Sequence, residues 1–299
     1  MRYISPLRYP GGKARLAPYI AGLITRQRPR PRSYAEAFAG GAGAALRLLV
    51  DGEVDHIYIN DLDPGISALW RCIFRDSKHL ARMVETEEVS VEAWHHHANI
   101  YRNPQERTDR ELGFATFFLN RCNRSGILRA RPIGGLDQSG NWKIDARFNR
   151  ETLADRIRFL GGYRDSVTLS QQDARSFIQA LEPKSPDVLL YVDPPYLVQG
   201  DRLYLDSLGR EDHEELARIL RSTDLRWLLT YDADKRITEE LYKGFRCVEF
   251  NIFHTAQIQR TGVEYAIFGN RLLLPEVSGI IGDGNFRWMT SKRKKKVDS

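Results

Sequence analysis

The sequence predicts an α/β fold in which a doubly wound sheet is interrupted by an inserted, mainly helical subdomain. Three observations lead to this prediction. The apolar run at 187–192 is rich in β-forming residues and is typical of a buried strand. A short strand beginning at Tyr34 leads through glycines into a helix at 44–50, as at the ligand site of a doubly wound sheet. From Pro64 the hydrophobic spacing is helical over a long stretch without a strand pattern.

The remaining elements follow in chain order. A helix is expected at 14–23 and a strand at 56–61. The insert begins with the 3.6-residue spacing of Ile66, Leu69, Trp70, Ile73 and Phe74, and its further helices are expected at 78–88, 91–101, 105–120 and 150–160. The sheet pattern resumes with strands at 167–170 and 226–231, helices at 211–221 and 234–242, and an antiparallel pair at 247–250 and 265–268. A polar stretch at 198–208 lacks a helical period and is expected to be a mobile lid.

These elements give the expected domain boundaries. The sheet domain is expected at 1–63 and 161–274, the helical insert at 64–160, and a basic tail, whose composition allows disorder, at 275–299. The chain has no apolar run near the roughly 20 residues that a membrane span needs, and its first residues lack a signal-peptide pattern. Cys72, Cys122 and Cys247 are isolated, which argues against disulfides and a zinc site and fits a cytoplasmic protein.

The net charge of +6 makes a polyanion a plausible partner, although part of the excess lies in the terminal run 292–296. A second basic segment is more specific. Arg121, Arg124, Arg129 and Arg131 alternate with Asn, Ser and Gly inside the stretch 121–143. Arginine and asparagine make bidentate contacts to guanine and adenine edges, so this stretch is a candidate DNA-reading hairpin; a solvated basic loop has the same composition.

The buried strand at 187–192 ends in Asp193, Pro194, Pro195 and Tyr196, a rigid corner at an edge where open sheets bind ligands. An exocyclic amine on an aromatic ring is a poor nucleophile, and acceptors for its N–H bonds promote its attack. The Asp193 carboxylate and the Pro194 carbonyl are such acceptors, Pro195 fixes the backbone, and Tyr196 offers a face for stacking a base. Read by itself, the tetrapeptide is equally compatible with a stiff turn and a surface tyrosine.

Further positions suit a nucleoside-bearing ligand. Gly11 and Gly12 allow a close approach of the backbone and Lys13 supplies a cation, although an ordinary turn before a helix has the same pattern. Glycines at 40, 41 and 43 lack the dinucleotide fingerprint, and Asp61 follows about 20 residues later, where a ribose ligand is expected, with Asp63 in reserve. Asp173 follows the strand at 167–170 and is expected to accept from a purine amine. The consecutive His95, His96 and His97 cannot all face one metal from a helix, so no metal site is expected.

The order of these motifs resembles the Dam-type DNA adenine N6-methyltransferases in their alpha arrangement. The likeness covers about residues 5–272. It implies a Rossmann-like, seven-stranded methyltransferase sheet, S-adenosylmethionine as cofactor, and adenine N6 in double-stranded DNA as the target of base flipping. The hairpin differs from that of GATC-reading members, so the recognition sequence does not carry over; restriction-associated and phage-encoded relatives have similar hairpins.

The resemblance and the residue patterns together give three candidate sets. The catalytic set is Asp193, Pro194, Pro195 and Tyr196. The cofactor-binding set is Tyr9, Gly11, Gly12, Lys13, Phe38, Gly40, Gly41, Gly43, Asp61, Asp173 and Asp193. The DNA-binding set is Asn120, Arg121, Asn123, Arg124, Arg129 and Arg131, in which Asn120 and Arg121 match the family's Leu-Asn-Arg entry into the hairpin.

Two alternatives stay open at this point. The Asp-Pro-Pro-Tyr corner also suits cytosine N4 or an RNA adenine, although the large insert favours duplex DNA. The chain is also compatible with a DNA-binding regulator that has lost catalysis, against which the intact corner and glycines argue. The sequence does not settle the oligomeric state; a monomer is plausible.

Overall fold

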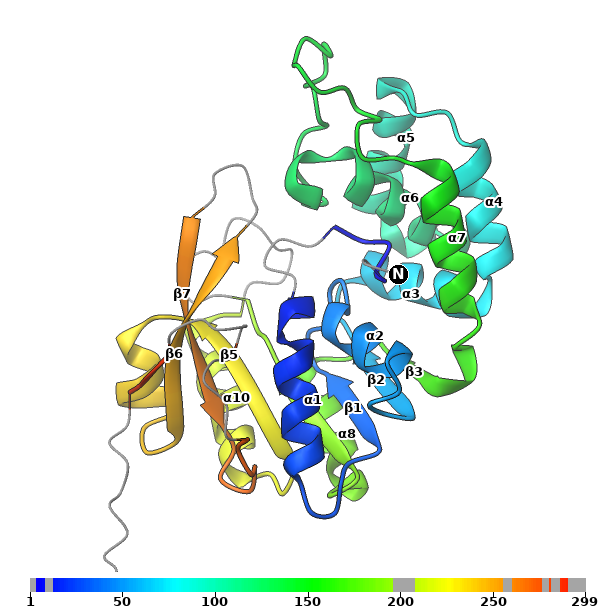
Figure 1. Ribbon diagram of the computed structural model, residues 1–299. Helices are drawn as coiled ribbons and strands as arrows, with labels where there is room; N and C mark the ends of the chain where they lie inside the picture. The colour runs from blue at the N-terminus through cyan, green and yellow to red at the C-terminus, as the bar shows by residue number, and fades with distance from the viewer. Residues whose placement is uncertain are drawn as a thin grey trace, which may run out of the picture.

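The computed structural model describes residues 4–8, 13–195, 208–254, 260–275, 280 and 286–289. It confirms the predicted α/β class: a twisted sheet carries helices on both faces, and a group of helices stands at one end (Figure 1). Its strand order is β3-β2-β1-β4-β5-β7-β6-β8. The parallel strands are β1 (Ser33–Glu36), β2 (His56–Asn60), β3 (Val167–Ser170), β4 (Val188–Val192) and β5 (Arg226–Asp232). The antiparallel strands are β6 (Arg246–His254), β7 (Arg260–Phe268) and β8 (Phe286–Trp288).

The sheet has eight strands in the described residues, one more than the seven that the resemblance implies. β8 pairs antiparallel with β6 and lies within the expected tail at 275–299. A strand of three residues is too short to show an alternating pattern of its own, so the sequence does not reveal it.

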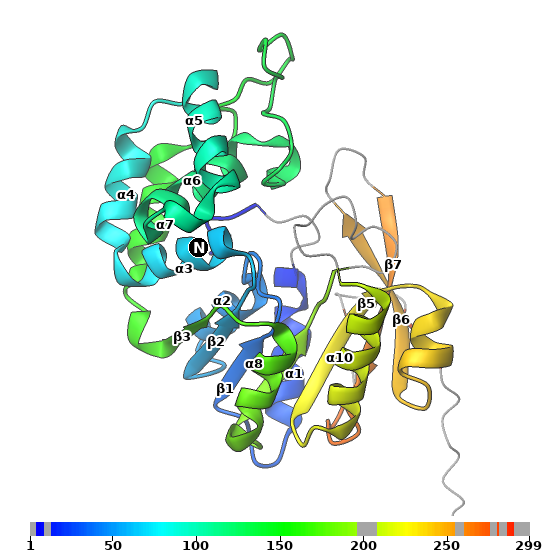
Figure 2. The same cartoon turned by 180° about the vertical axis from the view of Figure 1, so that it is seen from behind.

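Helices cover both faces of the sheet and create two core layers. α1 (Ala17–Arg26) and α2 (Gly43–Val50) lie on one face, and α8 (Ala174–Leu181) and α10 (Arg210–Ser222) lie on the other (Figures 1 and 2). In β4, Leu189 and Tyr191 join the first layer, whereas Leu190 and Val192 join the second. The alternation follows from the two-residue period of a strand, and it explains why every residue of β4 is buried.

The direction of winding changes between β1 and β4. From β1 the chain proceeds outward to β2 and β3, and it then returns to place β4 and β5 on the other side of β1. At such a switch point the loops after two neighbouring strands diverge and leave room for a ligand. The loop after β1 contains Gly40 and Gly41 and leads to Gly43 at the start of α2, and the segment after β4 begins with Asp193.

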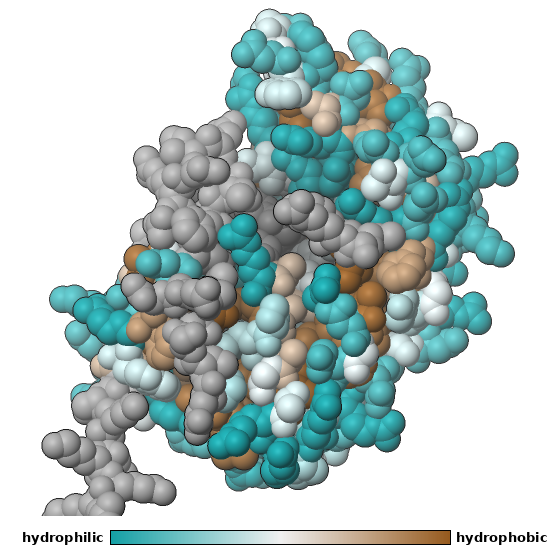
Figure 3. Space-filling model, viewed as in Figure 1, coloured by the Kyte–Doolittle hydropathy of each residue, from teal (hydrophilic) through white to brown (hydrophobic). Residues whose placement is uncertain are grey.

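The chain between β2 and β3 is helical, as predicted, although the division into domains stays a prediction. Its helices are α3 (Pro64–Arg75), α4 (Ser77–Thr86), α5 (Val91–Arg102), α6 (Asp109–Cys122) and α7 (Arg150–Gly161). α6 packs on α3 and α5, and α7 packs on α4. Several starts have side-chain caps: Asp63 accepts from Ile66, and Thr108 forms a capping box with Glu111. The surface over these helices is largely hydrophilic (Figure 3).

Short turns complete the described chain. They are η1 (Lys13–Leu16), η2 (Pro104–Glu106), η3 (Arg124–Gly126), η4 (Arg164–Ser166), η5 (Glu182–Lys184) and the π-turn η6 (Ile237–Leu241). The predicted helix at 234–242 is observed over 235–241, where its last five residues form η6, and the Asp234 carboxylate caps its start by accepting from the Arg236 amide. The predicted lid at 198–208 lies outside the described residues except for Leu208. Within the described part, no helix is long and apolar enough to cross a membrane.

The predicted hairpin at 121–143 is only partly regular. A single antiparallel bridge joins Asn123 and Pro132, and the rest consists of turns. The bend at Ser125 and Gly126 places both residues at positive φ, which prevents continuous strand pairing. The segment is therefore a folded loop that projects beyond α5 and α6, shown in green in Figure 1.

The close packing of α3 on α6 can be tested by substituting a glycine at their contact. A Cβ atom at Gly65 would lie 2.4 Å from the Thr116 hydroxyl and 2.7 Å from the Tyr101 ring. Gly65→Ala should therefore destabilise the protein by about 1–3 kcal/mol in urea unfolding. Gly22→Ala is the matched control, because its Cβ meets nothing closer than 3.8 Å, and it should be neutral or stabilising. Equal midpoints for the two variants would contradict this packing.

Candidate active site

The turn after β1 has a backbone that few residues adopt. Gly40 and Ala42 have φ values of 47° and 46°, in the left-handed region. Glycine adopts this conformation freely, whereas for Ala42 it costs about 1–2 kcal/mol. The Ala42 amide closes the turn on the Ala39 carbonyl, and Gly43 begins α2. The strain is concentrated at the switch point, where a tight turn brings backbone amides to the sheet edge.

Three distant side chains hold this turn. Asp61 accepts from the Gly40 amide at 2.8 Å, Trp70 donates its indole N–H to the Gly40 carbonyl at 2.9 Å, and Ser5 donates to the Gly41 carbonyl at 2.8 Å. Asp61 thus lies beside the glycines, as expected, but its role toward a ribose stays a prediction. Sequence analysis missed Ser5 and Trp70, because only the fold brings them to the turn.

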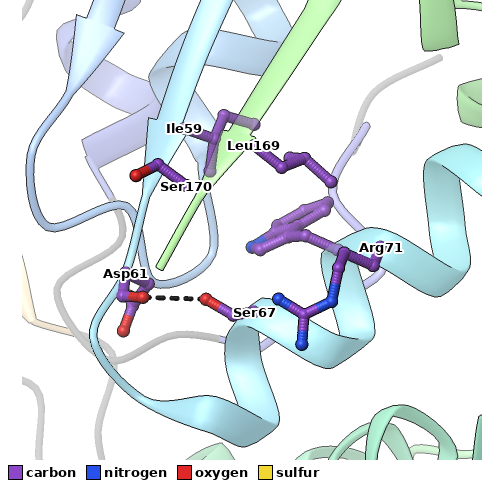
Figure 4. A pocket seen from close by; sticks show the side chains of 7 residues that line it. Ile59, Asp61, Ser67, Arg71, Leu169 and Ser170 are labelled. Atoms are coloured by element: carbon purple, nitrogen blue, oxygen red, sulfur yellow. Dashed lines mark hydrogen bonds between the residues drawn. The ribbon is translucent and has the colours of Figure 1, made fainter. Parts of the chain in front are cut away.

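A small cavity lies beside Asp61 (Figure 4). Its volume is ≈ 10 Å³. It is lined by Ile59, Asp61, Ser67, Trp70, Arg71, Leu169 and Ser170. Ser67 closes one side by donating to the Asp61 carbonyl at 2.7 Å. Such a space holds about one water molecule. The cavity is therefore not a nucleoside site.

On the other side of the switch point, Asp193 follows β4 and joins a polar network. Its Oδ1 atom accepts from the Thr230 hydroxyl at 2.7 Å and lies 3.4 Å from Lys13 Nζ. Lys13 Nζ also donates to both carboxylate oxygens of Glu264 at 2.8 Å. The Tyr191 and Thr230 hydroxyls are 2.7 Å apart. The network thus connects η1, β4, β5 and β7.

The burial of these charges changes their pKa values. Lys13 is 7% exposed, Glu264 1% and Asp193 21%. Burial raises the pKa of Asp193 to about 6, against the opposing effect of Lys13 and with a further increase from Glu264. Burial alone lowers the pKa of Lys13, but the two carboxylates outweigh it and the pKa lies above its ordinary value. Lys13 is therefore an ammonium, and Asp193 is an unusually basic carboxylate.

Another buried acid stands beneath the glycine turn. Glu36 ends β1 and accepts from the Ala45 amide at 2.9 Å and from the Tyr34 hydroxyl at 3.2 Å. Burial raises the pKa of Glu36 to about 8. Glu36 therefore ties β1 to the first turn of α2 and is mostly protonated at neutral pH.

Asp173 lies at the carboxyl end of β3, as predicted, and caps α8. Its carboxylate accepts from the Arg175 amide and from the Arg175 guanidinium, whose Nη1 also donates to Asp212 at 2.6 Å. The hydrogen bond from Arg175 lowers the pKa of Asp173. A contact of Asp173 with a purine amine stays a prediction.

Two members of the predicted DNA-binding set, Asn120 and Asn123, make hydrogen bonds inside the fold, and their contact with DNA stays a prediction. Asn120 is fully buried and pairs with the Arg8 backbone, accepting from its amide at 2.8 Å and donating to its carbonyl at 2.7 Å. Asn123 is also fully buried, accepts from the Trp94 indole at 2.6 Å and donates to the carbonyls of Ile127 and Leu128. Both amides are engaged with the backbone or the core, so in this conformation they do not reach a base.

The arginines of the segment divide into two groups. Arg124, Arg129 and Arg131 are exposed, near the exposed Trp142 in sequence. Arg121 instead donates to the carbonyls of Arg147 and Pro6, and Arg8 donates to the carbonyls of Arg121 and Asn123.

Arg8, Arg121, Arg147 and Arg156 form what we call the arginine cluster. Burial, followed by repulsion from the other three members, lowers the pKa of Arg121. None of the four forms an ion pair with a described carboxylate. This crowding of positive charge beside the predicted hairpin favours an anionic partner.

Four of the predicted residues fall in parts of the chain that the structure does not describe. Tyr9, Gly11, Gly12 and Tyr196 lie outside the described residues. Phe38 is partly buried against the second core layer. In the described part of the chain no group of three His, Cys, Asp or Glu is arranged to hold a metal ion. His97 is buried with Nε2 2.8 Å from Glu87, whereas His95 and His96 are exposed.

The family comparison and a curated relative point to one class of activity. A family model described as D12 class N6 adenine-specific DNA methyltransferase matches residues 9–259. The type II methyltransferase M.CviBI of Paramecium bursaria Chlorella virus NC1A is 22% identical over 224 residues, 73% of this chain and 79% of the relative. Among solved structures, the rRNA methyltransferase aviRa from Streptomyces viridochromogenes aligns with a TM-score of 0.39 and 17% identity, over 89% of this chain and 88% of its own. The family match spans both the glycine turn and the Asp193 corner.

The internal role of Asn120 has a measurable consequence. Asn120→Ala removes three hydrogen bonds and leaves the Arg8 backbone and the Gly126 carbonyl without these partners. We expect a loss of about 1–3 kcal/mol in unfolding free energy. Asn141→Ala, at an exposed position of the same segment, is the control and should change stability by less than about 0.5 kcal/mol. A stable Asn120→Ala variant that has lost only DNA binding would contradict this structural role and support the predicted contact with DNA.

Proposed function

Because the chain belongs to the D12 class of N6 adenine-specific DNA methyltransferases, we propose that it transfers a methyl group from S-adenosylmethionine to adenine N6 in duplex DNA, after flipping the base out of the helix. The observation that carries the proposal is the position of Asp193. It lies at the switch point, across from the strained glycine turn, with a pKa raised by burial. A strong hydrogen-bond acceptor and a turn suited to a nucleoside thus lie on the two sides of one sheet edge.

The chain's own residues would do the following work. The Asp193 carboxylate and the Pro194 carbonyl accept the hydrogens of the adenine amine and stabilise the positive charge that develops on nitrogen. Pro195 fixes this corner, and Tyr196 stacks on the flipped base. The base must leave the duplex because its amine cannot align for in-line attack inside the stack.

The cofactor would occupy the other side of the switch point. S-adenosylmethionine supplies an electrophilic methyl group on a positively charged sulfur. The glycine turn fits its nucleoside part, since Gly40 and Gly41 carry no side chain and Asp61 holds the turn. Lys13 is bound to Glu264, which favours a role beside Asp193 over direct contact with the cofactor.

Duplex DNA would lie along the projecting segment and the arginine cluster. Arg124, Arg129 and Arg131 are exposed and are the members of the predicted set that we propose to contact DNA, while Asn120, Arg121 and Asn123 shape the segment. The chlorella virus relative is named a type II methyltransferase, which supports methylation of a short recognition sequence. We infer no oligomeric requirement, because the proposed site is built from a single chain.

The direct test is transfer of a labelled methyl group from S-adenosylmethionine to unmethylated genomic DNA, followed by single-molecule sequencing of the modified positions. We expect N6-methyladenine within one short sequence. Asp193→Ala should abolish transfer, because the amine loses its acceptor, while cofactor-free DNA binding largely survives. Turnover by the Asp193→Ala variant would refute the mechanism, and label in RNA or at cytosine would refute the substrate.

The role of the exposed arginines can be separated from general attraction to phosphate. Arg124→Ala should weaken binding to the recognised sequence by about 1–3 kcal/mol and binding to random DNA by less. The control is Arg218→Ala on α10, an exposed arginine away from the projecting segment, and it should leave both affinities unchanged. If Arg124→Ala weakens both affinities equally and reduces the salt dependence, Arg124 contacts a phosphate instead of a base.

A further inference from the structure

The Asp193 network contains an acid to which neither the sequence patterns nor the family match gives a role. Glu264 lies on β7, which pairs antiparallel with β5, and in that register Glu264 is opposite Asp232. β5 and β4 are parallel neighbours, so the end of β5 and the end of β4 lie at the same edge of the sheet. This pairing brings Glu264 to the corner that holds Asp193, 71 residues away in sequence.

We propose that Glu264, acting through Lys13, is a positioning residue that keeps the Asp193 carboxylate oriented and basic for methyl transfer. The proposal rests on the proposed role of Asp193 as acceptor for the adenine amine. It does not depend on which DNA sequence is recognised.

The first part of the argument is geometric. Lysine has a long, flexible side chain, but Lys13 is 7% exposed and donates to both oxygens of Glu264 at 2.8 Å. Glu264 therefore fixes the ammonium at 3.4 Å from Asp193 Oδ1. Thr230 donates to the same oxygen at 2.7 Å. These two contacts on Oδ1 restrict rotation of the carboxylate. Because both contacts from the described residues fall on Oδ1, Oδ2 is the oxygen that we expect to accept from the adenine amine.

The second part concerns charge. A lysine paired with Asp193 alone would hold the carboxylate fully ionised but would make it a weak base, because the ammonium favours the charged form. Glu264 shares that ammonium and adds a negative charge, and both effects raise the proton affinity of Asp193. Among the described residues, the corner therefore contains one cation between the buried Glu264 carboxylate and the partly exposed Asp193 carboxylate. Asp193 stays ionised at neutral pH and remains a strong hydrogen-bond acceptor.

Other titratable groups also face Asp193 and have to be considered. They are Lys13 on η1, Tyr34 and Glu36 on β1, Tyr191 on β4, Tyr231 on β5 and Glu264 on β7. The tyrosines are neutral, since burial raises their pKa values further, and Glu36 is mostly neutral below its pKa of about 8. Among the described residues, Lys13 and Glu264 are thus the charged groups that set the pKa of Asp193 near neutral pH.

The test is the pH dependence of single-turnover methyl transfer across the range around pH 6. Activity requires ionised Asp193, so the rate falls as the pH drops through its pKa. Glu264→Gln keeps the shape but removes the negative charge, which lowers the pKa of Asp193 and moves this acidic limb to lower pH. Thr230→Val removes a hydrogen bond to the carboxylate, so its limb moves to higher pH. Both variants should lower the plateau rate by about 10- to 100-fold, since the carboxylate is less well held.

Three further variants make the result decisive. Glu239→Gln, an exposed glutamate in η6, is the matched control and should leave the profile unchanged. Glu264→Asp keeps the charge and should restore the limb toward the wild-type position. If Glu264→Gln does not fold, Lys13→Gln is compared with the double variant Lys13→Gln/Glu264→Gln. The single variant retains the second negative charge, so its limb should lie at higher pH than that of the double variant.

The inference would be overturned if folded Glu264→Gln showed the same acidic pH midpoint as the wild type. It would also be overturned if Lys13→Gln and the double variant had the same midpoint. Glu264 would then have a structural role only. The proposed function fails differently: Asp193→Ala would then retain turnover, whatever the Glu264 variants do.

Discussion

A buried lysine between two carboxylates is the interaction on which the proposed active site depends. Lys13 lies in the amino-terminal turn η1, Asp193 follows β4, and Glu264 belongs to β7, so one ammonium joins three parts of the chain that are far apart in sequence. Removing one partner from a buried ion pair costs about 3–5 kcal/mol, because the remaining charge has lost its compensation. The ion pairs therefore stabilise the fold. They form only when η1, the parallel strand β4 and the antiparallel strand β7 meet at one corner.

The strand order of the sheet places both halves of the proposed site near this corner. The switch between β1 and β4 separates the glycine turn from Asp193 and places the two after neighbouring strands at one edge of the sheet. Side chains from other parts of the fold bind both the glycine turn and the Asp193 carboxylate. Asp61, Trp70 and Ser5 bind the turn, whereas Thr230 and Lys13 bind the carboxylate. A strained backbone at Ala42 persists because these contacts determine its conformation from several directions.

Much of this architecture is predictable from the sequence, because it rests on local patterns. The strand β4 is predicted by its apolar run, and the helices of the insert are predicted by the 3.6-residue spacing of their apolar residues. The glycine turn and the Asp193 corner are predicted by their residue types at the ends of strands. What sequence reasoning missed is non-local. Glu264 lies in an ordinary strand pattern, and its importance appears only when β7 pairs with β5. Asn120 and Asn123 have side chains that suit base edges, and the sequence does not reveal that these amides also bind backbone carbonyls within the fold. Side-chain type alone cannot distinguish these two uses.

The amino-terminal segment connects the proposed DNA-binding region to the proposed reaction centre. Arg8 is bound through its backbone to Asn120 at the end of α6 and through its guanidinium to the carbonyls of Arg121 and Asn123. Ser5, three residues earlier, holds the glycine turn, and Lys13, five residues later, holds Asp193 and Glu264. A segment of nine residues therefore touches the insert, the turn and the corner. Each contact is a hydrogen bond or an ion pair with a defined direction, so a shift of the turn, the insert or the corner away from the residue that binds it would break that contact. The short stretch of chain from Arg8 to Lys13 therefore links the proposed DNA-binding region with the proposed acceptor of the adenine amine.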